Sequence, residues 1–182
     1  MMIKIIFTLF LFSLGISNDQ IPGEDQKRPI ILKGGIIHTV STDIFEGYDI
    51  LFSKGKIVRI EKNIMASPET DVYDVFGKHI IPGYIAPITR IGLVEIGLVK
   101  QTRDFAERGS FNPNVKANVS YNPDSDLIPI TRSNGVLVVN SVPAGGRISG
   151  QSSVMMLDGW TWEQATLKLS LIHISEPTRQ SL

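Results

Sequence analysis

Short apolar runs separated by breaks rich in glycine and charge dominate the first half of the chain, and this pattern predicts β-strands. The runs lie at 30–32, 36–40, 49–52, 57–60 and 71–76. Gly34-Gly35 separates the first two runs, which predicts two strand pieces around a turn or bulge. A short loop containing Gly55 separates the third and fourth runs, which predicts a β-hairpin. We therefore expect residues 29–82 to form a small antiparallel sheet module.

Beyond Pro82-Gly83 the apolar runs lie further apart, which predicts strands alternating with loops and helices. Residues 84–89 are expected to form one strand and residues 136–140 a second, buried and parallel to it. The segment 109–124 is rich in asparagine and contains two prolines, so we expect a long loop. A helix is expected over 127–132.

A glycine- and serine-rich stretch follows at 145–153, and we expect it to be a turn-rich connector. Thr161 is then suited to cap a helix that starts at Trp162. Gln164 stands three residues after Thr161, which is the spacing of a capping box.

Composition limits the classes of site that the chain can carry. Cysteine is absent, which excludes disulfides, thiolate metal sites and a cysteine nucleophile. Lysine plus arginine and aspartate plus glutamate both number 18, so the net charge is zero. Without a basic stripe, we expect no nucleic-acid partner.

The N-terminal residues have the pattern of a targeting segment. Lys4 is the only charge before an apolar run at 5–14, and small residues follow at Gly15 and Ser17. We expect a signal peptide at 1–17, cleaved after Ser17, then a polar linker at 18–28. The alternative is an uncleaved anchor, but the apolar run is shorter than the ~20 residues that span a bilayer. The prediction is an exported protein, periplasmic or secreted, with no membrane span after cleavage.

The C-terminal residues 169–179 resemble the in-frame translation of an adapter used in sequencing libraries. We therefore expect Lys168 to be the last natural residue and residues 169–182 to be an adapter-derived tail, which removes His173 from any site argument. The alternative is a natural strand at 169–174, ended by Pro177.

The stretch from Gly77-Lys78 through an apolar run to Pro82-Gly83 resembles the start of the catalytic barrel in the amidohydrolase superfamily, especially its exported imidazolonepropionase-like members. Residues 109–115, 121–126 and 157–163 are similar to the same subgroup. The resemblance covers roughly 29–168. It implies an α/β protein: part of a β-sandwich at 29–82, followed at 83–168 by the first strands of a truncated (β/α)8 TIM-like barrel, since a complete barrel takes about 250 residues.

The metal-binding part of that family pattern is missing. In the family an aspartate and two metal-binding histidines follow the Pro-Gly corner, and these positions fall here on Ala86, Ile88 and Arg90. In the resembling subgroup the paired histidines are often missing too. His38 and His79 lie far apart in the predicted sheet module, where packing or surface roles are commoner. We assign no metal ligand and no cofactor to this chain, and leave room for a divalent metal in the full-length parent.

Two residues at the ends of the expected barrel strands are candidate substrate-binding groups. Arg90 follows the first strand and could clamp a carboxylate or phosphate; the alternative is an ion pair with Glu95 or Asp104. Asn140 ends the second strand, where barrel active-site residues lie, and could equally cap the next turn. No catalytic residue is assigned.

The resemblance implies a hydrolase of carbon–nitrogen bonds in non-peptide or cyclic amides, with a small-molecule substrate, inactive as this fragment. The alternative is a non-catalytic barrel relative that binds a small anionic or peptide-like ligand.

Overall fold

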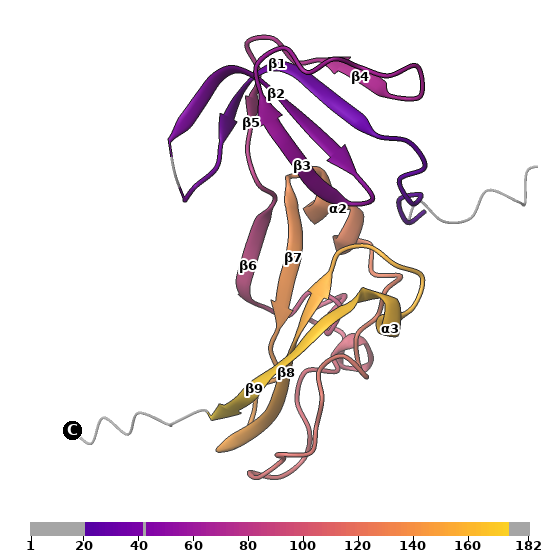
Figure 1. Cartoon of the computed structure of the whole chain (residues 1–182). Coiled ribbons are helices and arrows are strands. Elements are labelled where there is room, and N and C mark those ends of the chain that lie inside the picture. The colour runs from indigo at the N-terminus through magenta and orange to yellow at the C-terminus, as the bar shows by residue number, and fades with distance from the viewer. Residues whose placement is uncertain (1–20, 42, 175–182) are drawn as a thin grey trace, which may run out of the picture. The chain divides into compact units, whose positions relative to one another are not determined.

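The computed structural model describes residues 21–41 and 43–174, with the side chains of 170–174 excepted, and it divides the chain into two compact units (Figure 1). One unit is Gly23–Gly83, and the other contains the residues from Tyr84 onward. The described part of the chain is mostly β-sheet with few helices. The predicted signal peptide lies outside the described residues.

The unit Gly23–Gly83 is a five-stranded sheet in the order β3-β2-β1-β4, with β5 also paired to β1. Its strands are β1 Ile30–His38, β2 Ile44–Ser53, β3 Lys56–Glu61, β4 Asp71–Asp74 and β5 His79–Ile80. β1–β2 and β2–β3 are antiparallel, whereas β4 and β5 both pair with β1 in parallel. The prediction of a wholly antiparallel sheet is therefore wrong for β4 and β5. After β3 the chain crosses to the other side of β1 and enters β4 in the direction of β1.

Glycine placement explains two irregularities that the sequence predicted. The register of β1 against β2 shifts on both sides of Gly35, and Gly34 has φ +73°, so β1 is one strand with a bulge. The β2–β3 turn has Lys54 and Gly55 at φ 52° and 70°. Two successive positive φ values are typical of the tight turn that matches the twist of a hairpin.

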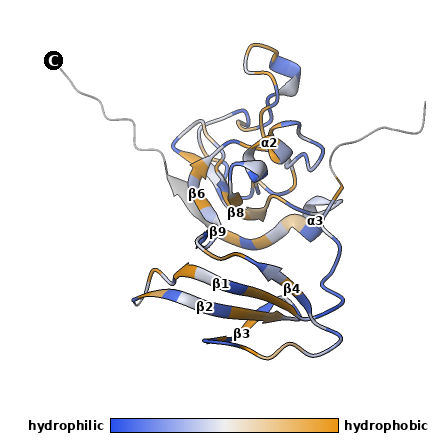
Figure 2. Cartoon of the chain, turned by 90° about the horizontal axis from the view of Figure 1, so that it is seen from above, coloured by the Kyte–Doolittle hydropathy of each residue, from blue (hydrophilic) through white to orange (hydrophobic). Residues whose placement is uncertain are grey.

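The interior of this unit contains Ile31, Ile37, Ile50 and Ile64, all buried. Figure 2 shows hydrophobic segments along β1, β2 and β3. One charged side chain, Asp49, is buried with them at 2% exposure. Its Oδ1 accepts a hydrogen bond from the Gly34 amide and its Oδ2 one from the Ile64 amide, both at 2.8 Å.

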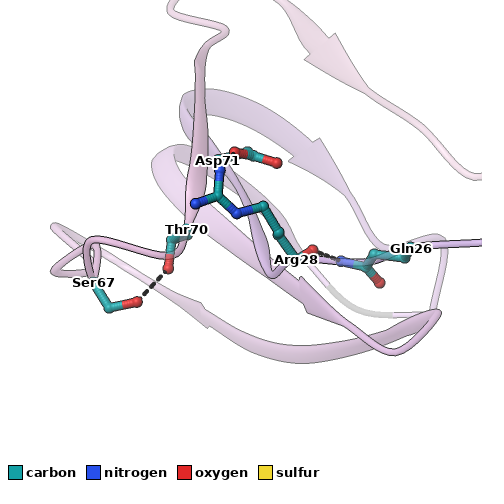
Figure 3. A network of polar contacts seen from close by, with 5 residues as sticks. All are labelled: Gln26, Arg28, Ser67, Thr70 and Asp71. Atoms are coloured by element: carbon teal, nitrogen blue, oxygen red, sulfur yellow. Dashed lines mark hydrogen bonds and ion pairs between the residues drawn. The ribbon is translucent and has the colours of Figure 1, made fainter.

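Polar contacts at the edge of the unit join the start of β1 to β4 (Figure 3). Arg28 forms an ion pair with Asp71 at 3.2 Å, and Gln26 Nε2 donates to the Arg28 carbonyl at 2.9 Å. Ser67 and Thr70 are hydrogen-bonded through their hydroxyls at 2.8 Å. The ion pair is about half exposed, so it contributes at most about 1 kcal/mol.

The unit that begins at Tyr84 is built on a four-stranded sheet in the order β6-β7-β8-β9. Its elements are β6 Tyr84–Thr89, the 3-10 helix η1 Lys100–Thr102, α2 Leu127–Ser133, β7 Val136–Ser141, β8 Ile148–Met156, α3 Trp162–Ala165 and β9 Thr166–Ile174. β6 and β7 are parallel and the other pairs are antiparallel. The predicted strand at 84–89, helix at 127–132 and parallel strand at 136–140 are confirmed.

The connector predicted at 145–153 is wrong from Ile148 onward, where β8 begins. Its serines at 149, 152 and 153 are all buried, at 1% exposure or less. Small side chains allow this strand to lie close to its neighbours, and β7 supplies an edge for it to pair with. The prediction of a connector relied on the glycine and serine content of this segment, because its pairing with β7 cannot be seen from the local sequence.

The core of this unit lies between the sheet and the helices and contains Tyr121, Ile128, Val139, Met155, Leu157 and Ala165. Thr161 caps α3 as predicted, since its hydroxyl accepts from the Gln164 amide at 3.3 Å. Gln164 Oε1 accepts from the Trp160 amide at 3.0 Å, one residue before the expected position. The helix is only four residues long before β9 begins.

Candidate functional site

The carboxyl ends of β6 and β7 lie at the same edge of the sheet because the two strands are parallel. A cavity of about 300 Å³ is found there, lined by Ile88, Thr89, Arg90, Val142, Pro143 and Ala144. The Val142 amide donates a hydrogen bond to the Thr89 carbonyl at 2.9 Å, which joins the residue after β7 to the end of β6. In parallel α/β architectures this is the edge at which ligands bind.

Arg90, predicted as an anion clamp, lines this cavity and is exposed. Its guanidinium carbon lies 4.1 Å from the ring centroid of Phe105, and that of Arg103 lies 5.1 Å from the same centroid. Phe105 is fixed by its carbonyl, which accepts from the Ala144 amide at 2.7 Å. The partner of Arg90 is therefore an aromatic face and not the carboxylate that the alternative expected. Two guanidinium groups therefore lie against one aromatic ring beside the cavity.

Asn140, the other predicted binding residue, lies on β7 and is not among the residues that line the cavity. Its Nδ2 donates to the Pro87 carbonyl at 3.0 Å, which ties β7 to β6 where their register shifts. Its Oδ1 is buried and has no hydrogen-bond partner among the described residues. This contact links β7 to β6, and substrate binding by Asn140 stays a prediction.

Glu95, expected as a partner of Arg90, belongs to a separate polar cluster. Its Oε2 accepts from the Ser125 hydroxyl at 2.7 Å and its Oε1 from Asn122 Nδ2 at 3.1 Å. Burial raises the pKa of the nearby Tyr121 hydroxyl well above its usual value, and the negative charge of Glu95 raises it further. These contacts fix the loop that precedes α2.

The two histidines that the sequence placed far apart meet across β1 and β5. His38 Nε2 and His79 Nδ1 are 2.8 Å apart, and the ring centroids are separated by 5.1 Å. No local pattern predicts this contact, because it depends on the parallel register of Ile36 with His79. Within residues 21–41 and 43–174, no cluster of three or more histidine, cysteine, aspartate or glutamate side chains is arranged to hold a metal ion.

The residues at the family's metal positions do not fit a metal. Ile88 has no side-chain ligand atom and the Arg90 cation would repel a metal ion, and Ala86, at the aspartate position, has no carboxylate. These three residues therefore hold no metal on this chain.

Comparison with known proteins gives two informative matches. An amidohydrolase from Thermotoga maritima MSB8 is structurally similar, with a TM-score of 0.70 and 30% identity, over 76% of this chain and 36% of that protein. Dihydropyrimidinase 1 of Caenorhabditis elegans is 34% identical over 82 residues, which is 45% of this chain and 16% of the relative. The resemblance to amidohydrolases is confirmed.

Other comparisons add less. A D-hydantoinase structure is 34% identical over 42% of the chain, but its TM-score of 0.34 is too low to support an argument. No protein-family model matches the amidohydrolase-like chain. The chain spans about a third or less of the length of these relatives. None of the helices in the described part of the chain has the length and apolar character needed to cross a bilayer.

Proposed function

We propose that the chain is the N-terminal part of an exported amidohydrolase-like hydrolase that acts on carbon–nitrogen bonds of cyclic amides or related non-peptide compounds. Gly23–Gly83 would be part of the flanking β-sandwich, and β6, α2 and β7 would begin the barrel. The observation that carries the proposal is the 30% identity and TM-score of 0.70 to the Thermotoga amidohydrolase. The likeness to a dihydropyrimidinase supports cyclic amides as the substrate class.

Arg90 is the residue of this chain that we assign to substrate binding. Its planar guanidinium presents several donors and can hold a carboxylate or an oxyanion in a bidentate manner. Stacking on Phe105 orients the guanidinium beside the cavity at the ends of β6 and β7. The general base and any metal ligands of the parent would lie on later strands. The 182-residue chain is therefore expected to have no hydrolase activity.

The second candidate function is binding without catalysis of a small anionic or peptide-like ligand. The observation that favours it is that Arg90, stacked on Phe105, stands where the family pattern has a metal-binding histidine. The Arg90 guanidinium at this position can bind an anionic ligand directly, without a metal ion. Histidines and aspartates at the ends of the later strands would favour hydrolysis, and their absence would favour binding.

The test uses the complete reading frame of the parent, expressed with its leader. Hydrolysis of hydantoin and dihydrouracil is followed with and without a divalent-metal chelator, and the mature N-terminus is read by mass spectrometry. We expect hydrolysis, an Arg90→Ala variant with KM raised at least about tenfold, and a mature chain that begins at Asn18. Arg59→Ala is the matched control, since Arg59 belongs to the unit Gly23–Gly83 and forms an exposed ion pair with Glu61. Anion binding without turnover would support the second function, and neither activity would refute both.

A further inference from the structure

We propose that His38 and His79 form a two-histidine site for a divalent transition metal, with Cu²⁺ the preferred ion, that links β5 to β1. The inference concerns the unit Gly23–Gly83 and is independent of the proposed hydrolase function.

The backbone brings the two rings to one face of the sheet. Ile36 pairs with His79 in the parallel register of β1 and β5, and His38 lies two residues beyond Ile36 on the same strand. Because side chains alternate between faces, His38 and Ile36 share a face and His79 lies beside them. The result is a pair of imidazole nitrogens, Nε2 of His38 and Nδ1 of His79, that point toward one another at 2.8 Å.

That separation matches chelation once each ring turns from the hydrogen bond so that both nitrogens face a shared ion. A metal–imidazole bond is about 2.0 Å long, so two ligands at a right angle on one metal have nitrogens about 2.8 Å apart. Right-angled ligation by nitrogen is typical of square-planar or tetragonal Cu²⁺ and Ni²⁺, and Cu²⁺ binds most tightly in the divalent series. Tetrahedral Zn²⁺ needs the nitrogens roughly 3.3 Å apart and would have to spread them.

The surroundings allow the metal to enter and the rings to turn. His79 is exposed and His38 is half-buried, so water can reach both and fill the remaining positions on the metal. In the structure one ring must donate its proton to the other, since two protonated nitrogens cannot share this contact. On metal binding, that proton would move to the other nitrogen of its own ring, so that each neutral ring offers one lone pair to the metal.

The consequence of binding would be a tighter β1–β5 pair. β5 is only two residues long, and the Ile36 amide bonds to the Lys78 carbonyl at 2.9 Å beside it. A ligand that binds only the closed arrangement stabilises it by mass action. At a free Cu²⁺ concentration of 100 times Kd, opening of this pair would fall by about 100-fold.

The experiment titrates Cu²⁺ into the full chain in chelator-free buffer and follows histidine ring signals by NMR and binding by calorimetry. We expect the signals of His38 and His79 to broaden together at the first equivalent, before those of His173, and the Ile36 amide to exchange more slowly. Broadening of one histidine alone, or of all three equally, would overturn the proposal. This readout needs no variant.

Substitutions give a second test. We expect His38→Gln and His79→Gln each to weaken Cu²⁺ binding at least about tenfold, because either change turns a bidentate site into a single ligand. His173→Gln removes the third histidine of the chain and should leave binding unchanged. Unchanged affinity in either sheet variant, or an equal loss in the control, would contradict the site. Protection of the Ile50 amide reports that each variant keeps the sheet.

Discussion

Replacing Asp49 by asparagine keeps the shape of a buried side chain but removes its charge and one of its two acceptors. In the native sheet the carboxylate accepts from the Gly34 amide in the β1 bulge and from the Ile64 amide after β3, both at 2.8 Å. It therefore fixes both the bulge and the start of the crossover to β4. An asparagine oxygen can satisfy one amide, but its NH₂ group then faces the other N–H.

The magnitude follows from these two contacts. Leaving one buried N–H unpaired destabilises by about 1–3 kcal/mol, and converting the remaining charge-assisted bond to a neutral one by about 1 kcal/mol. We expect a total near 3 kcal/mol, which is a factor of about 100 in the opening equilibrium of the unit. Hydrogen exchange of the Ile37 and Ile50 amides measures this directly, because core amides exchange when their unit opens.

Asp74→Asn is the matched control in the same unit. Its carboxylate is exposed and accepts a single hydrogen bond, from the Phe76 amide at 2.9 Å. We expect an effect of about 0.5 kcal/mol, roughly a twofold change in exchange. If Asp49→Asn changes core exchange as little as this control does, the assignment of Asp49 as the link between bulge and crossover is wrong.

Two further predictions concern the unit that begins at Tyr84, where denaturation can be followed by tryptophan fluorescence. Gly92→Ala should destabilise this unit by about 3 kcal/mol, because Gly92 has φ +77° and a Cβ there would lie 2.3 Å from the Tyr121 ring. Gly97→Ala is the control: the space around Gly97 is open, so the change in stability should be less than about 0.5 kcal/mol. Tyr121→Phe should be neutral or stabilising by about 1 kcal/mol near pH 7, because the hydroxyl is buried without a partner among the described residues. The pKa of Tyr121 is raised on folding, so the stability of the native state is retained below pH about 10 and falls above it by up to about 1.4 kcal/mol per pH unit. The phenylalanine variant should show a flatter curve of stability against pH over pH 8–11. An equally steep curve in the variant would refute that assignment.

Structural features formed by residues close together in the sequence could be predicted from it. The hairpin turn at Lys54-Gly55 and the cap at Thr161 depend on residues within a few positions of each other, and both were predictable. β6 and β7 were predictable because each is a short apolar run with clear ends.

Long-range pairing was not predictable in the same way. Nothing local to Asp71 shows that β4 runs parallel to β1, since the direction depends on where the chain crosses after β3. The same applies to the site: the position of Arg90 at the end of β6 follows from the sequence, but its stacking on Phe105, 15 residues later, does not. His38 and His79 meet for the same reason, through a register that only the folded sheet defines.

The origin of β9 is the last prediction, and it can be tested on the DNA. β9 continues from Lys168, paired with Val154, through the residues at 169–174 that resemble an adapter. Its register against β8 shifts at three points. An exposed strand edge pairs with any segment of suitable β propensity, so irregular pairing is expected of a strand that did not evolve with its partner.

We therefore expect a read of the source DNA across the Lys168–Leu169 junction to leave the adapter sequence and continue in frame into further barrel strands. Those strands would supply the histidines and aspartates that decide between hydrolysis and binding. Genomic codons for Leu169 to Arg179 would refute the adapter origin. β9 would then be a natural strand, and a small β-rich binding module would become the better account of the chain.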